Sequence, residues 1–294
     1  MQTKTILFDL NHNEMLNPNE SEYSDFLAFL QNLNLKIKKV ENKDLTKKAL
    51  EDIDILIIGN PIDDYFSNIE INEILNYVRI GGNLIIISEY GGDYLQKTNL
   101  NDIAPNFGIL FEKNLIKAKD SEMNKVSNII PIRKFLNKSL LNGLREVIIG
   151  GTCSLYLNKG SKALLQTDKD GVWSEIYNIT SGKWIQEQEQ QQCVIAACNE
   201  FGQGKVVALG DIDIFSNNNQ FGLNSLDNQK FLKNIFAWLL EPVKRSDVMT
   251  FILEQIGTIQ NNIKEFHLSL NNIIETLGIL EKRLSFIEEK IKKD

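Results

Sequence analysis

The residues of this chain that could do chemistry are polar side chains that directly follow apolar, strand-like segments. They are Asp9, Asn11 and His12 after residues 5–8, Asn60 after residues 53–58, Ser88, Glu89 and Tyr90 after residues 84–87, and Asp211 and Asp213 after residues 205–209. In open α/β sheets, ligands bind beyond the carboxyl ends of the strands. Acids and amides at that edge suit a polar, hydroxyl-rich ligand or a cation, although ordinary loop polarity and turn capping would place the same residue types there. We therefore treat these side chains as the lining of one candidate crevice.

Ser88 stands where a nucleophile elbow would place its serine, immediately after a buried strand. Hydrolases of that kind need a histidine and an acid later in the chain. The sequence has two histidines, His12 beside the first strand and His267 in a predicted coiled coil, and neither suits this role. Two isolated histidines also exclude the HExxH zinc hydrolases. The sequence therefore predicts a protein without a catalytic site.

A calcium-like spacing occurs early in the chain. Asp9, Asn11 and Asn13, with Glu20 as the twelfth residue, copy the ligand positions of an EF-hand loop. Glu14 replaces the glycine that such a loop needs at its sixth position, and a strand rather than a helix precedes it. We interpret the spacing as coincidence and predict neither a metal nor a cofactor.

Two further patterns have a structural interpretation. Gly202 and Gly204, followed by Lys205, resemble part of a phosphate-binding loop, but they lead into a strand rather than a helix and so predict a tight hairpin turn. The three cysteines lie in apolar β-like runs and form no CxxC pair, which favours buried reduced thiols over a disulfide or a zinc site. They are Cys153, Cys193 and Cys198.

The elements that must position these side chains alternate between helix and strand in the first part of the chain. Apolar residues at helical spacing predict helices over residues 24–33, 45–50 and 69–80, and apolar runs predict strands over residues 36–40, 53–58 and 83–88. Strands that are apolar on both faces and are separated by helices are typical of a parallel, doubly wound sheet.

The middle of the chain changes character before this pattern returns. Residues 146–200 hold short β-rich runs with a polar segment at 186–192, which predict an antiparallel annex to the sheet and a mobile loop. A strand over 205–209 and a helix over 228–240, closed by Pro242, complete the sheet. The predicted fold class is α/β, a doubly wound and mostly parallel sheet with a β-rich annex, in one domain over residues 1–242.

The last segment, residues 247–294, predicts a C-terminal coiled coil. Its large apolar residues follow one another at steps of three and four, which is an a/d heptad seam. They are Met249, Ile252, Ile256, Ile259, Ile263, Phe266, Leu270, Ile273, Leu277, Leu280, Leu284, Ile287 and Ile291. Such a seam needs another helix, so we expect a homo-oligomer or a helical protein partner. A long amphipathic helix folded back on its own domain is the alternative.

Composition limits the remaining classes of function. The chain has 294 residues, of which 43% are hydrophobic and 24% charged, with a net charge of −7. The negative charge opposes binding to nucleic acid. No apolar run approaches the ~18 residues of a membrane helix, and the first residues lack the pattern of a signal peptide. We expect a cytoplasmic protein without direct membrane insertion.

Several runs together resemble a known family. In the first half they are 63–67 (DDYFS), 81–93 (GGNLIIISEYGGD), 98–101 (TNLN) and 107–109 (FGI), and in the second half 163–167 (ALLQT), 173–175 (WSE) and 202–211 (GQGKVVALGD). In order and spacing they are similar to the GIFT domain family, the module shared by the N-terminal domain of intraflagellar transport protein 52 and the GldG-type ABC-transport auxiliary proteins. The resemblance covers most of residues 3–242.

This resemblance implies a fold like that of class I glutamine amidotransferases, with the catalytic cysteine absent. Glu89 or Tyr90 stands about where that cysteine would be. The family's members serve as a scaffold in a transport complex or accompany a membrane pump. We therefore expect a non-catalytic scaffold or adaptor that assembles through its coiled coil. A sensing module for a small polar ligand or carbohydrate is the alternative, and an amidotransferase-like hydrolase comes third.

Overall fold

The computed structural model describes residues 3–41, 44–119, 126–158, 160–188 and 192–242, together with single positions between 256 and 280. The chain divides into two compact units, residues 1–243 and residues 244–294. Each unit is treated separately below.

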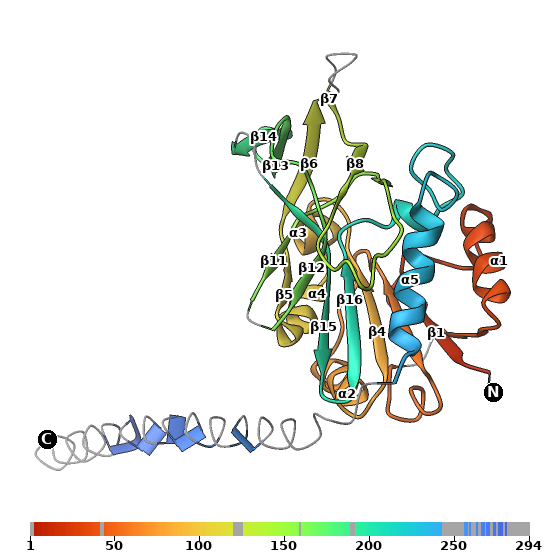
Figure 1. Ribbon diagram of the computed structural model, residues 1–294. Helices are drawn as coiled ribbons and strands as arrows, with labels where there is room; N and C mark the ends of the chain where they lie inside the picture. The colour runs from red at the N-terminus through yellow and green to blue at the C-terminus, as the bar shows by residue number, and fades with distance from the viewer. Residues whose placement is uncertain are drawn as a thin grey trace, which may run out of the picture. The chain divides into compact units, whose positions relative to one another are not determined.

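A mixed sheet of eight strands forms the centre of the first unit (Figure 1). Its parallel part contains β2 (Lys36–Val40), β1 (Thr5–Asp9), β3 (Ile55–Gly59), β4 (Asn83–Ile87) and β16 (Gly204–Leu209), in that spatial order. Antiparallel pairing then adds β15 (Val194–Phe201), β12 (Lys162–Gln166) and β9 (Lys134–Phe135). The prediction of a mostly parallel central sheet is confirmed.

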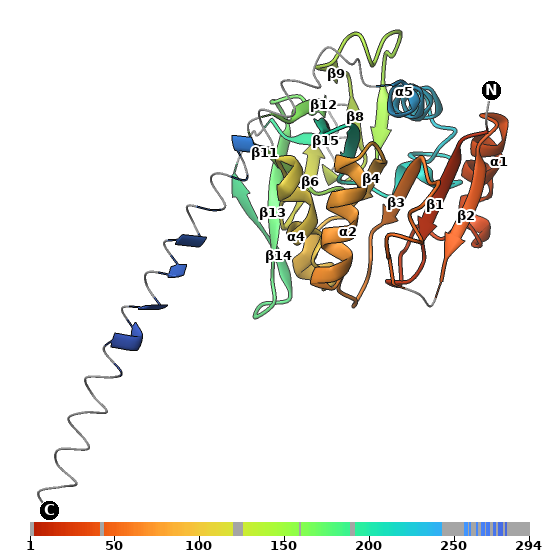
Figure 2. The ribbon, with the colours of Figure 1, turned by 90° about the horizontal axis from the view of Figure 1, so that it is seen from below.

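Helices cover both faces of this sheet. On one face lie α1 (Ser24–Asn32) and α5 (Asn228–Leu240), and on the other lie α2 (Asn68–Arg79) and the short α4 (Leu100–Ile103). Figure 2 shows α5 and α2 on opposite sides of the strands. The short α3 (Gly92–Gln96) follows β4, and 3-10 turns occupy Ser21–Tyr23, Ala104–Phe107 and Asp213–Phe215.

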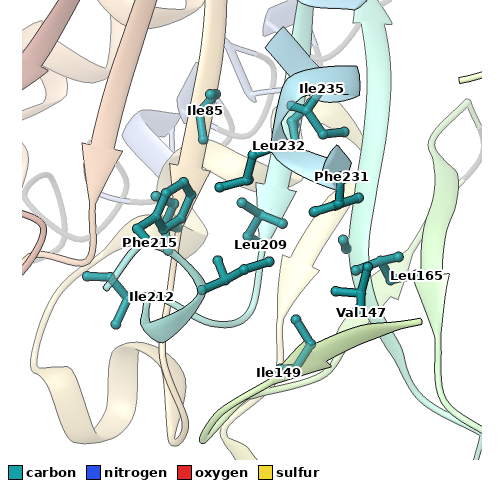
Figure 3. Close-up of a cluster of buried hydrophobic side chains, with 14 of the residues drawn as sticks. Ile85, Val147, Ile149, Leu165, Leu209, Ile212, Phe215, Phe231, Leu232 and Ile235 are labelled. Atoms are coloured by element: carbon teal, nitrogen blue, oxygen red, sulfur yellow. The ribbon is translucent and has the colours of Figure 1, made fainter. Parts of the chain in front are cut away.

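Alternation along the parallel strands explains why both faces are buried. Ile85 and Ile87 of β4 point into the core under α1 and α5, whereas Leu84 and Ile86 of the same strand point into the core under α2. Figure 3 shows the first of these cores, where Leu209 meets side chains from the first turns of α5. Because successive side chains of a strand point to opposite faces, a continuous apolar run is the sequence of a strand that is covered on both sides.

The β-rich annex forms further sheets as well as the edge of the central one. A four-stranded antiparallel sheet contains β14 (Lys183–Gln188), β13 (Val172–Asn178), β6 (Asn114–Lys119) and β7 (Val126–Ser127). Two-stranded sheets pair β8 (Ile130–Ile132) with β10 (Val147–Ile149), and β5 (Ile109–Phe111) with β11 (Leu155–Leu157). The annex is therefore more divided than predicted.

Three local predictions have clear outcomes. The helix over residues 45–50 is wrong, because residues 47–49 form only a turn and residues 45–46 have no regular structure. The amide of Leu45 donates to the Glu70 carboxylate at 3.2 Å. The mobile loop at 186–192 is also wrong as far as Gln188, which belongs to β14; residues 189–191 lie outside the described residues. The hairpin turn is confirmed, since Gly202 has a φ of +63° between β15 and β16 and a Cβ there would clash with the Arg79 carbonyl.

The three cysteines of the first unit are buried thiols, as predicted. Burial raises the pKa of the Cys193 thiol to about 12 and that of the Cys198 thiol to about 11. Among the described residues, no helix combines the length and the apolar character needed to cross a membrane.

In the second unit, every described position between 256 and 280 is helical. The large apolar side chains described there are 42–66% exposed, and they are Ile256, Ile259, Ile263, Phe266, Leu270, Ile273, Ile274, Leu277 and Leu280. The remaining residues of the predicted seam lie outside the described residues, namely Met249, Ile252, Leu284, Ile287 and Ile291.

Candidate functional site

The predicted crevice residues gather at the carboxyl edge of the parallel strands, but in two separate groups. The first, which we call the histidine cluster, contains Asp9 at the end of β1, His12 and Glu14 in the following loop, and Glu70 in the first turn of α2. The second, the acidic cluster, contains Glu89, Asp211 and Asp213 after the neighbouring strands β4 and β16. The strand order explains the division, since β3 lies between β1, which carries the first group, and the adjacent strands β4 and β16, which carry the second.

His12 is the centre of the first cluster and is only 3% exposed. Its Nδ1 lies 2.7 Å from Asp9 Oδ2, and its Nε2 lies 3.3 Å from Glu70 Oε1. Its backbone amide donates to Glu14 Oε2 at 3.1 Å, and its ring lies against the Phe66 ring with 3.9 Å between centroids. Both imidazole nitrogens therefore face carboxylates.

Glu70 is held in place by a capping box at the start of α2. The Ser67 amide donates to Glu70 Oε2 at 2.9 Å, and the Glu70 amide donates to the Ser67 hydroxyl at 3.3 Å. Burial would raise the pKa of Glu70, but the hydrogen bonds from Ser67 and Leu45 outweigh it and lower the pKa. Glu70 is thus an ionised acceptor for the imidazole.

The pKa values of His12 and Glu14, in contrast, are raised. Burial would lower the pKa of His12, but the hydrogen bond and the negative charge of Asp9 outweigh it and raise the pKa. Burial, followed by the charge of Asp9, raises the pKa of Glu14 to about 10. The cluster therefore favours a positive imidazole and leaves Glu14 as the acid that is hardest to ionise.

The acidic cluster is held mainly by backbone amides. Glu89 Oε1 accepts from the Tyr90 amide at 3.0 Å, and its Oε2 accepts from the Ile212 amide at 3.4 Å. Asp211 Oδ2 accepts from the Gly150 amide at 3.3 Å, and its Oδ1 accepts from the Asp213 amide at 2.8 Å. Burial and the neighbouring carboxylates raise the pKa of Glu89 and of Asp211 well above the ordinary values. Both shifts favour the protonated form of these carboxyls.

The remaining predicted residues do not complete a reactive arrangement. Asn60 and Ser88 are fully buried, whereas Asn11 and Asp213 are half-buried. Tyr90 is 40% exposed and makes an edge contact with Trp184, at 6.1 Å between ring centroids, instead of lining a crevice. The strand-end edge is filled by its own side chains.

The predicted elbow serine, Ser88, has no histidine beside it among the described residues. His12 is engaged by Asp9 and Glu70 rather than by Ser88. The calcium-like spacing builds no loop of that kind either, since the Asn13 amide group donates to the Ile62 carbonyl and Glu20 is exposed.

Hollows in the surface lie elsewhere. One of about 430 Å³ is lined by residues of β5, β6, β13 and β14, together with Asp93 and Tyr94 of α3 and with Glu112 and Lys113 between β5 and β6. A second, of about 370 Å³, adjoins β13 and β14 and shares Tyr94 with the first. Neither is lined by a residue of the predicted crevice.

Sequence reasoning missed two members of the histidine cluster, Glu14 and Glu70. The capping box Ser67-x-x-Glu70 is visible in the sequence, but it predicts only where α2 begins. Glu14 was interpreted as a defect of a calcium loop. The spacing Asp9-x-x-His12-x-Glu14 does not by itself predict a shared site. It would do so only with the knowledge that the loop after β1 folds back on the end of that strand.

These features define an α/β domain with a mixed central sheet and a filled strand-end edge, consistent with the predicted amidotransferase-like fold. Residues 5–122 match the family model of the IFT52 GIFT domain. The resemblance to the GIFT domain family, which the sequence motifs predict, is therefore confirmed.

Solved structures share this fold at low sequence identity. The N-terminal domain of mmIFT52 is 20% identical with a TM-score of 0.66, over 80% of this chain and 96% of that one. A cytoplasmic protein from Salmonella typhimurium is 11% identical with a TM-score of 0.55, over 80% and 98%. A putative ThuA-like protein from Bacteroides uniformis is 13% identical with a TM-score of 0.51, over 82% and 93%. No curated protein matches the chain.

Proposed function

We propose that this chain is a non-catalytic scaffold or adaptor protein, in which a GIFT-like domain is brought into an oligomer or a larger complex by the C-terminal helix. The observation that carries the proposal is the apolar helical face described between residues 256 and 280, whose large side chains are 42–66% exposed. An apolar stripe of this length is an aggregation liability unless a second helix covers it.

The filled strand-end edge supports the non-catalytic part of the proposal. Asp9, Glu89 and Asp211 are 1–4% exposed, so a substrate has no access to them without rearrangement. An acid or base that works on a substrate must come within hydrogen-bond reach of it. The third candidate, an amidotransferase-like hydrolase, would need a base beside Ser88, and in the described part of the chain His12 is held by Asp9 and Glu70 instead.

A ligand-sensing module is the second candidate, and one observation favours it. The hollow of about 430 Å³ combines an exposed aromatic ring, Tyr94, with carboxylates and amides from Asp93, Asn101, Glu112 and Asn114. Pockets of this composition suit small polar ligands. This site would lie on the annex sheets rather than at the strand ends, where the sequence places it.

The scaffold proposal is tested by charge insertion into the seam of the full-length protein. Ile263→Glu with Leu270→Glu introduces two carboxylates into the apolar stripe, and Asn261→Glu adds one at the f position of the preceding heptad as a matched control. We expect light scattering to give at least two chains per particle for the unchanged protein and the control, and a lower mass for the double variant.

One result would overturn the proposal. The unchanged protein would have the mass of one chain, and its seam amides would be protected from hydrogen exchange in a way that the double variant removes. That result would mean that the seam packs on the chain's own domain.

A further inference from the structure

The histidine cluster gathers three potential metal ligands around one point. His12 Nδ1 and one carboxylate oxygen each from Asp9 and Glu14 lie within 4.8 Å of one another. We propose that these three residues bind a divalent transition-metal ion, of the Zn²⁺ or Mn²⁺ class, as a structural site. This proposal does not depend on the assembly of the C-terminal helix.

Each ligand is oriented by a bond from its other polar atom. Asp9 Oδ1 accepts from the Asn11 amide at 3.0 Å, which leaves Oδ2 directed at His12. Glu14 Oε2 accepts from the His12 amide at 3.1 Å, which leaves Oε1 on the same side. Glu70 Oε1 lies 3.3 Å from His12 Nε2, where it can accept the ring N–H, and Nδ1 is the ring nitrogen directed at the carboxylates of Asp9 and Glu14. A carboxylate behind the imidazole in this way is the usual support of a metal-bound histidine.

An unpartnered atom points independently to a missing ligand. Glu14 Oε1 has no hydrogen-bond partner in the described part of the chain, although its side chain is fully buried, and it lies 3.8 Å from His12 Nδ1. Leaving a buried carboxylate oxygen unsatisfied is unfavourable, because the group loses its water without gaining a partner. A cation between Glu14, Asp9 and His12 would satisfy it.

Charge balance supports the same conclusion. Three buried carboxylates, from Asp9, Glu14 and Glu70, surround one imidazole. A divalent cation would take the place of the protons that Glu14 and His12 Nδ1 hold without it, so that the imidazole becomes neutral and Glu14 ionised. The rival occupant is a proton held by Glu14, and the experiment below separates the two.

The donor set selects the class of metal. One imidazole nitrogen with carboxylate oxygens suits Zn²⁺ or Mn²⁺ better than Ca²⁺ or Mg²⁺, which prefer oxygen alone. For metal–ligand bonds of about 2.1 Å, the separations of 2.7 and 3.8 Å from His12 Nδ1 correspond to angles of about 80° and 130° at the ion. The Phe66 ring and the carboxylate of Glu70 flank the three ligands, and Asp9, His12 and Glu14 are all buried, so the ion would lie in the interior of the protein.

The test uses full-length protein stripped with EDTA, loaded with Zn²⁺ or Mn²⁺ alone, and dialysed before elemental analysis. We expect one ion per chain and a higher thermal midpoint for the loaded protein. Competition with a chromophoric chelator should show that Glu70→Gln weakens binding about 10–100-fold, as expected for loss of a group that orients a ligand, and that Glu14→Gln weakens it further. Asp211→Asn, in the acidic cluster, is the matched control and should bind as the unchanged protein does.

Three results would overturn the proposal. They are no retained ion with either metal, equal binding by Glu14→Gln and the unchanged protein, and loss of binding in Asp211→Asn alone. If Glu14→Gln does not fold, ¹⁵N-histidine labelling of the unchanged protein decides the question, because the chain has only two histidines. A metal-induced shift of His12 Nδ1 supports the site, and an unchanged spectrum contradicts it.

Discussion

The acidic cluster should make the protein less stable as the pH rises above neutrality. Glu89 and Asp211 are 4% and 1% exposed. Burial raises the pKa of both carboxyls, and repulsion from a neighbouring carboxylate adds to it, from Asp211 on Glu89 and from Asp213 on Asp211. In the unfolded chain both carboxyls ionise near pH 4. The native state therefore binds more protons than the unfolded state between that pH and the raised pKa values. The free energy of unfolding then falls by about 1.4 kcal/mol per pH unit for each proton retained.

Replacing both carboxyls with amides, Glu89→Gln with Asp211→Asn, removes these protons while keeping the side-chain shapes. Above about pH 4, the free energy of unfolding should fall less steeply with pH in the double variant than in the unchanged protein, by up to about 1.4 kcal/mol per pH unit for each proton removed. Urea unfolding followed by circular dichroism at pH 6, 7 and 8 measures this slope. Contributions from the histidine cluster are common to both proteins and cancel in the comparison.

Asp227→Asn is the control for this experiment. The Arg145 amide donates to the exposed Asp227 carboxylate and lowers its pKa, so its proton is lost far below pH 6 and the slope should not change. Equal slopes for the unchanged protein and the double variant would refute the reasoning. They would mean that Glu89 and Asp211 are ionised in the native state.

Three further predictions concern single side chains. Lys205 Nζ donates to the carbonyls of Trp238 and Glu241, at 2.6 Å each. Lys205→Met should therefore lower the free energy of unfolding, measured in urea, by about 2–4 kcal/mol. An unchanged midpoint of urea unfolding would contradict this. Ser88→Ala should leave glutaminase, esterase and peptidase assays at background, as in the unchanged protein, and a loss of measurable turnover on substitution would count against the non-catalytic proposal. Under the heptad assignment, Arg283 at g meets Glu288 at e of a parallel neighbour, so Arg283→Glu should weaken self-association modestly, by ~0.2–1 kcal/mol, and the added Glu288→Arg should restore it in sedimentation equilibrium. No change on the single reversal would indicate antiparallel helices or a different partner.

Elements with strong local patterns could be predicted from the sequence almost to the residue. The strand Lys36–Val40 and the helix Asn228–Leu240 have the predicted bounds, because each is marked by its own periodicity and punctuation. The short segment 45–50 failed for the opposite reason. Six residues form too few helical hydrogen bonds to be stable alone, and tertiary contacts of Leu45 and Leu50 determine their conformation instead.

The candidate site was predictable only in part. The rule that strand ends carry polar residues found Asp9, His12, Glu89 and Asp211, because it depends on local sequence alone. It could not separate them into two clusters, since that depends on which strands are neighbours. It also could not find Glu70, which lies 58 residues from His12 in the chain and reaches it through the packing of α2 on the sheet.

The set of helices and strands, their apolar faces and the family motifs could therefore be predicted, because short segments of the sequence encode each of them. Only the tertiary structure decided that β12 and β9 extend the central sheet while β13 and β14 form another, and that the strand-end acids are buried. The physical reason is that strand pairing and the burial of a charge depend on contacts between residues far apart in the chain. Those contacts are selected by the packing of the whole domain, and no local pattern contains them.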